Sequence, residues 1–155
     1  TLGYTHAGLF YTISAVSMII IRMISKHFMD TVPAIKTMTG AVACGILCCL
    51  MLLAAPYGEP VFLASGIFYG LATGISLPLN QSVAVKNTPP ERWGAANALF
   101  LLANDIGIGF ASVIWGVIND SFGFQTSIVC VIVCLIASYA SAWIVYPARD
   151  KRWRQ

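Results

Sequence analysis

Charged residues are scarce in this sequence. Only 10% of its 155 residues are charged, while 58% are hydrophobic, and the mean hydropathy is +0.79. Soluble domains carry about 25% charged residues, so the composition excludes an ordinary soluble fold. Acids are the scarcer sign, with six Asp and Glu against nine Lys and Arg. The chain therefore belongs to the membrane class.

Five apolar segments are each long enough to cross about 30 Å of hydrocarbon as a helix. They cover residues 4–25, 35–55, 61–85, 93–118 and 124–146. Their hydrophobicity is continuous, whereas the strands of a membrane barrel alternate over about 10 residues. The sequence therefore predicts an all-α polytopic membrane protein with five transmembrane helices, and the lipid bilayer as its first partner.

Two of the connections between these segments contain no Lys or Arg. They are residues 56–60 and 119–125, and the positive charges fall in the other connections and in the tail. In a five-span chain these positive segments share one side, which the positive-inside rule makes cytoplasmic. We therefore expect the N-terminus outside and the C-terminus in the cytoplasm. The net charge of +3 reflects this topology and gives no reason to expect nucleic-acid binding.

The five cysteines all lie inside apolar spans. Cys44, Cys48 and Cys49 are in the second span, and Cys130 and Cys134 are in the fifth. No His, Asp or Glu accompanies them there, so we interpret them as small apolar packing residues. No metal and no cofactor are predicted.

Polar residues gather in the first, third and fourth spans, and one of them is an acid. Asp105 lies about 20 Å from both Arg92 and Asp120 along a helix, which places it near the bilayer midplane. Ionisable groups are costly there and usually functional. We therefore predict that three helices line a polar path while the second and fifth face lipid. The candidate path residues are Asn104, Asn80, Gln81, Tyr11 and Ser14.

Several of these candidates have a structural alternative. The Ser14 hydroxyl can bond a carbonyl of its own helix. Asn80 and Gln81 can form hydrogen bonds between helices, and so can Asp105. The sequence alone leaves both interpretations open.

Glycines recur on two of the polar spans. Gly66, Gly70 and Gly74 fall at four-residue intervals and share one helix face, where a neighbouring backbone can approach closely. The fourth span has Gly107, Gly109 and Gly116. Both sets are predicted helix-packing positions.

The connection after the first span carries charges of both signs. Arg22 or Lys26 can pair with Asp30 in one conformation, which makes these residues candidates for a cytoplasmic gate. Lys26 can equally be a topology determinant only.

The segment from Gly66 to Gly123 resembles the C-terminal half of a major facilitator superfamily transporter, most closely the bacterial drug-efflux-type branch. The resemblance rests on Gly-x3-Gly-x3-Pro ending at Pro78, PPERWGAAN at 89–97, DIGIG at 105–109 and GVINDSFG at 116–123. It implies that residues 1–155 form a partial C-terminal transmembrane domain, equivalent to helices eight to twelve of a twelve-helix fold. It also implies the bacterial inner membrane.

Two departures from the family pattern stand out. The family's loop after helix eight usually reads Arg-x3-Gly-Lys/Arg-x2-Asp-x2-Gly. Arg22 and Asp30 fit this pattern, but Lys26 and Pro33 replace glycines and His27 replaces the basic residue. In addition, the first seven helices, which the family's alternating-access transport requires, are expected to be missing from this chain.

The sequence and the resemblance together predict a fragment of a secondary active transporter, a proton-coupled exporter of small molecules. Asp105 would carry the proton. One alternative is a truncated or assembly membrane protein that does not transport. A membrane-embedded enzyme would need a clustered nucleophile, base or metal set, and Asp105 has no His or Lys beside it in its span. We therefore predict no enzymatic activity.

Overall fold

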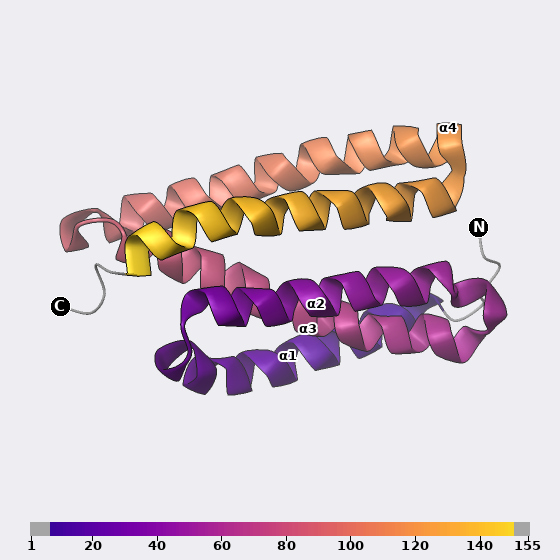
Figure 1. The fold of residues 1–155 in the computed structure, drawn as a ribbon, viewed down its shortest axis with the longest axis horizontal. Helices are drawn as coiled ribbons and strands as arrows, with labels where there is room; N and C mark the ends of the chain where they lie inside the picture. The colour runs from indigo at the N-terminus through magenta and orange to yellow at the C-terminus, as the bar shows by residue number, and fades with distance from the viewer. Residues whose placement is uncertain (1–6, 151–155) are drawn as a thin grey trace. The chain divides into compact units, whose positions relative to one another are not determined.

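The structure is a computed structural model that describes the backbone of residues 7–150 and the side chains of residues 8–24, 32–56 and 58–143. Figure 1 shows its helices. These are α1 (Ala7–Thr31), α2 (Ala34–Leu53), α3 (Glu59–Lys86) and α4 (Trp93–Asp150), with short 3-10 turns at η1 (Ala55–Tyr57) and η2 (Pro90–Arg92). The described residues contain no strand. The predicted all-α fold is confirmed.

Prolines mark the breaks between the helices. Pro33 precedes α2, and its carbonyl accepts hydrogen bonds from the backbone N–H groups of Lys36 (2.9 Å) and Thr37 (3.3 Å). Pro89 and Pro90 separate α3 from α4. Proline has no backbone N–H, so the chain tolerates it at a helix start, where that donor would have no partner within the helix.

Gly123 interrupts α4. Its φ of +81° and ψ of 168° are non-helical, and this region of backbone space is accessible almost only to glycine. Figure 1 shows the ribbon bending there. The helix therefore consists of two arms, a first arm at 93–122 and a second arm at 124–150.

Among the residues that the structure describes, three helical stretches are long and apolar enough to cross a membrane. They are Ala34–Leu53, Glu59–Lys86 and the 54 residues Pro90–Trp143, and a shorter apolar stretch covers Gly8–Ile24. At ~1.5 Å per residue the longest would extend about 80 Å, well over twice the hydrocarbon thickness. The break at Gly123 allows it to cross as two arms.

The chain divides into two compact units. The first unit comprises residues 1–76 and 128–155, and the second comprises residues 77–127. In the first unit, α2 supplies much of the buried core, with Ala41, Cys48 and Cys49 among its most buried side chains. In the second unit, the last turns of α3 accompany the first arm of α4.

Candidate functional site

The glycines of α3 lie against α1 in the first unit. A methyl group built on Gly66 would lie 3.1 Å from both the Phe10 carbonyl oxygen and Ser14 Oγ. On Gly70 it would overlap the Ser14 carbonyl oxygen and lie 2.8 Å from Ser17 Cβ, and on Gly74 it would overlap the side chain of Ile21. The two helices are therefore in contact at a separation that only glycine permits.

Ser14 belongs to this packed contact. Its side chain is only 4% exposed, and its hydroxyl donates to the Phe10 carbonyl oxygen at 2.7 Å. This is the bond within its own helix that a Ser or Thr in a membrane helix commonly makes. Tyr11 differs, because its ring is 70% exposed and is accessible from outside the unit.

An aromatic cluster joins the same two helices. The ring of Phe10 stacks on that of Phe62, with centroids 5.0 Å apart. The centroid of the Tyr69 ring lies 6.1 Å from that of Phe10. Tyr11 packs edge-on against Phe10 at 5.5 Å. Sequence reasoning missed this cluster, although the seven-residue spacing of Phe62 and Tyr69 places both on one face of α3.

An amide pair joins α3 to the first arm of α4 in the second unit. Gln81 Nε2 donates to Asn97 Oδ1, so Gln81 makes the interhelical hydrogen bond that was one of its two predicted roles. The side-chain oxygen of Gln81 can still accept hydrogen bonds, and the side-chain NH2 of Asn97 can still donate them. The path candidate Asn80, which precedes Gln81 in the chain, is partly buried. Asn97 was not among the predicted path residues.

Asp105 lies on an exposed face of the first arm. Ala98, Ser112 and Gly116 are also exposed, and their spacings from Asp105 of seven, seven and eleven residues place all four on one side of the helix. Asn104 is turned away from this face and is partly buried. Asp105 is eight residues, about 12 Å, along the helix from Asn97.

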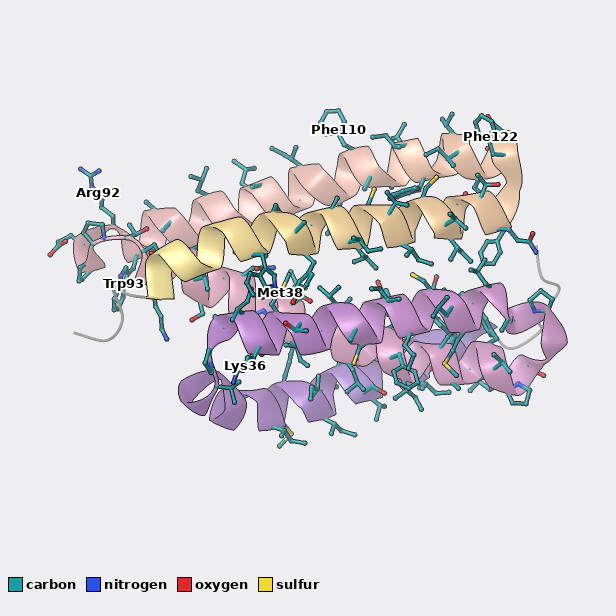
Figure 2. All side chains as sticks on the ribbon, viewed as in Figure 1. Lys36, Met38, Arg92, Trp93, Phe110 and Phe122 are labelled. Carbon is teal, nitrogen blue, oxygen red and sulfur yellow. The ribbon has the colours of Figure 1, made fainter. Side chains whose placement is uncertain are left out.

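The glycines of the first arm have open surroundings. A methyl group on Gly107, Gly109 or Gly116 would meet no atom within 4 Å. Figure 2 shows Phe110 and Phe122 projecting from this arm. Unlike the α3 glycines, these three contact no neighbour within the described part of the chain, and their packing role stays a prediction.

The gate candidates lie in and near the last turns of α1. Arg22 is exposed. Lys26 and Asp30 belong to the helix, but their side chains lie outside the described residues. The conformation-dependent ion pair stays a prediction.

A chain of hydrogen bonds joins α2 to the second arm of α4 in the first unit. Thr39 Oγ1 donates to the Ile35 carbonyl oxygen at 2.8 Å. Its oxygen must therefore accept the bond from the Tyr139 hydroxyl, also at 2.8 Å, and that hydroxyl accepts from Trp143 Nε1 at 2.8 Å. The sequence interpretation had treated these two spans as almost wholly apolar. The four-residue spacing of Tyr139 and Trp143 was the available signal.

Comparison with known proteins gives one family and one relative. Residues 1–155 match the family described as Major Facilitator Superfamily. The Staphylopine export protein of Staphylococcus aureus (strain Mu50 / ATCC 700699) is 25% identical over 146 residues, which are 90% of this chain and 37% of that protein. The chain thus spans little more than a third of this relative's length. No solved structure gives a significant match.

Proposed function

The chain belongs to the Major Facilitator Superfamily, and on that premise we propose that it is part of a proton-coupled secondary transporter that exports small molecules by alternating access. Membership of this family and the apolar helices make it an integral membrane protein. The direction of transport is supported by the relative, whose name describes an exporter.

The position of Asp105 is the observation that carries the proposal. It is an acid in an apolar arm, on an exposed face with small neighbours at Ala98, Ser112 and Gly116. A carboxylate in hydrocarbon is driven toward its neutral form, and one that faces water is ionised. A group that alternates between these surroundings binds and releases a proton in each transport cycle.

The other path candidates fall into two groups. Tyr11 offers an exposed phenol in the first unit. In the second unit, Asn80, Gln81 and Asn104 are partly buried amides, which we propose contact substrate through their side-chain amide groups. Ser14 contributes mainly to the packing of α1 against α3.

The proposal includes partners beyond this chain. We propose that seven further helices complete the transporter, and that Arg22, Lys26 and Asp30 form a cytoplasmic gate. The N-terminus would face outward across a bacterial inner membrane. The matched region covers only 37% of the relative's length, which supports the proposal that further helices take part in transport.

Replacing Asp105 tests the coupling role. In inverted membrane vesicles that contain the complete transporter, we expect Asp105→Asn to lower the transport of ethidium driven by the pH gradient by about tenfold or more, a loss of ~1.4 kcal/mol in rate terms. Binding of ethidium to the purified protein should persist, because the variant removes only the titrating group.

The matched control is Asp120→Asn, which removes an exposed acid near the end of the same arm. We expect it to leave the transport rate and its pH dependence close to those of the unaltered protein. If Asp105→Asn and Asp120→Asn gave the same rates and the same pH dependence, Asp105 would not be the coupling group.

A further inference from the structure

The second arm of α4 runs antiparallel to α2 within the first unit. A methyl group on Gly45 would contact Leu135 Cδ1 at 3.5 Å, and Thr39 bonds Tyr139 at 2.8 Å. Residue numbers therefore fall along α2 as they rise along α4. Continuing this register by one turn places Trp143 at the level of Ile35 and Lys36, at the start of α2.

Polar aromatic groups mark this level. The indole N–H of Trp143 is held on the Tyr139 hydroxyl, and this hydroxyl is held on Thr39. The Trp143 side chain is nonetheless 56% exposed. Exposed Trp and Tyr at helix ends are characteristic of the boundary between hydrocarbon and lipid headgroups.

An aliphatic stripe leads from Trp143 into the membrane. Val133 is 60% exposed and Ile136 is 52% exposed, and their spacings from Trp143 of ten and seven residues keep all three on one face of the arm. The distance from Trp143 to Val133 is about 15 Å along the axis, which is half of the ~30 Å hydrocarbon core. Val129, which is 51% exposed, lies on the same face and extends the stripe to about 21 Å, so the stripe is at least as long as one leaflet.

One described positive charge lies at the same level. Lys36 is exposed at the start of α2 (Figure 2), and α2 contains no acid. Basic residues at helix ends attract anionic lipid, each contributing about 1 kcal/mol near the membrane surface.

We propose that this surface, which we call the lipid face and define as Lys36, Thr39, Val133, Ile136, Tyr139 and Trp143, binds an anionic phospholipid. The negatively charged headgroup lies at the level of Lys36 and Trp143, and an acyl chain follows Ile136 and Val133. The combination of a cation, polar aromatics and an aliphatic stripe at least one leaflet long accommodates an anionic phospholipid in charge and in length.

Quenching of Trp143 fluorescence tests the proposal. The full 155-residue chain, with Trp93, Trp115 and Trp153 replaced by Phe, is reconstituted into vesicles that contain brominated phosphatidylglycerol or brominated phosphatidylcholine. We expect phosphatidylglycerol to associate with Trp143 about fivefold more strongly, the equivalent of ~1 kcal/mol for one cation. Equal quenching by the two lipids would overturn the proposal.

Two lysine variants show whether the preference for phosphatidylglycerol depends on Lys36 or on surface charge in general. We expect Lys36→Gln to abolish most of the preference for phosphatidylglycerol, and Lys86→Gln, which removes an exposed cation from the end of α3, to retain it. Equal losses in the two variants would overturn the proposal. Helical circular dichroism should be the same in both, since both side chains are exposed.

Two further experiments test whether a different molecule occupies the lipid face. Glycerol 3-phosphate added to the vesicles should leave the preference unchanged, and its loss would assign the site to a free phosphate ester instead of a lipid. Raising the protein-to-lipid ratio should also leave it unchanged. Protection of Trp143 from both brominated lipids at high ratio would show that a second copy of the chain covers this face, which contradicts the proposal.

Discussion

Gly70 illustrates how one residue sets the distance between two helices. The backbone carbonyl of Ser14 and the Cβ of Ser17 occupy the space where a side chain at this position would begin. The neighbouring atom is backbone, which cannot rotate away as the end of a flexible side chain can. Any larger residue must therefore move α1 as a whole.

We predict that Gly70→Ala destabilises the chain by about 1–3 kcal/mol, the typical cost of overpacking a tight contact. The measurement is the unfolding midpoint in detergent, followed by circular dichroism. This loss must exceed the roughly 1 kcal/mol that Ala gains over Gly in a helix.

Gly107→Ala is the matched control, because nothing lies within 4 Å of its added methyl group. It should be neutral or slightly stabilising. Equal midpoints for the two variants would contradict the close contact between α1 and α3.

The hydrogen bond between Gln81 and Asn97 holds two helices together and is also weak. Gln81 and Asn97 satisfy one donor and one acceptor between them, which holds α3 to the first arm. Interhelical bonds of this kind contribute about 0.6 kcal/mol on average in a membrane protein. The pair is therefore weak enough to rearrange, as the proposed substrate contact at Gln81 would require.

At the scale of the element, α4 depends on its break. Without Gly123 its 58 residues would form one rod, since the sequence on both sides of the glycine is helical. The non-helical φ and ψ at this position end the first arm and start the second. A single residue thus determines how many membrane crossings the element can make.

We predict that Gly123→Ala costs about 1–3 kcal/mol, because this backbone conformation is strained for any residue with a Cβ. The unfolding midpoint and the rate of protease cleavage at residues 119–125 in detergent report the effect. Cleavage should become faster as the bend loosens.

Gly116→Ala provides the comparison within the same arm. Its glycine has no positive φ and open surroundings, so both readouts should stay near those of the unaltered chain. A Gly123→Ala protein as stable as Gly116→Ala would contradict the requirement for glycine at the bend.

The third helix changes its surroundings along its length. It belongs to the first unit up to Ser76 and to the second from Leu77, and Pro78 follows directly. Proline removes one helical hydrogen bond and its ring crowds the preceding turn. The boundary between the two units therefore lies next to the position where proline weakens the hydrogen bonding of α3.

At the scale of the whole molecule, the distribution of positive charge predicts the orientation. With its cysteines replaced by alanine, the chain can carry one cysteine at Glu91, beside a positively charged connection, or at Ser121, in an uncharged one; both positions are exposed. A membrane-impermeant maleimide added to whole cells should label Ser121→Cys and leave Glu91→Cys unlabelled. Inside-out vesicles should reverse this result, and labelling of both from one side would contradict the predicted topology.

Much of this architecture could be predicted from the sequence. Composition and the length of the apolar runs determine the all-α membrane class, since only a helix satisfies the backbone of a long continuous apolar segment in lipid. Pro33, Pro89 and Pro90 lie at helix boundaries, where the missing N–H breaks no helical bond, whereas Pro78 lies inside α3. The family match over residues 1–155 confirms the Major Facilitator Superfamily itself, while the C-terminal half and the drug-efflux-type branch stay predictions.

Tertiary structure decided which residues meet. Both glycine sets are predicted packing positions, yet Gly66, Gly70 and Gly74 contact α1, while a methyl group on Gly107 or Gly109 would meet no atom within 4 Å in the described part of the chain. A glycine is a packing site only when another helix is present at that face.

The hydrogen-bond partners show the same division. Gln81 bonds Asn97, 16 residues away, and Thr39 bonds Tyr139, 100 residues away. Local sequence determines that such groups exist and which face of a helix they occupy. Their partners depend on how distant helices pack and in which register, and that is a property of the folded chain alone.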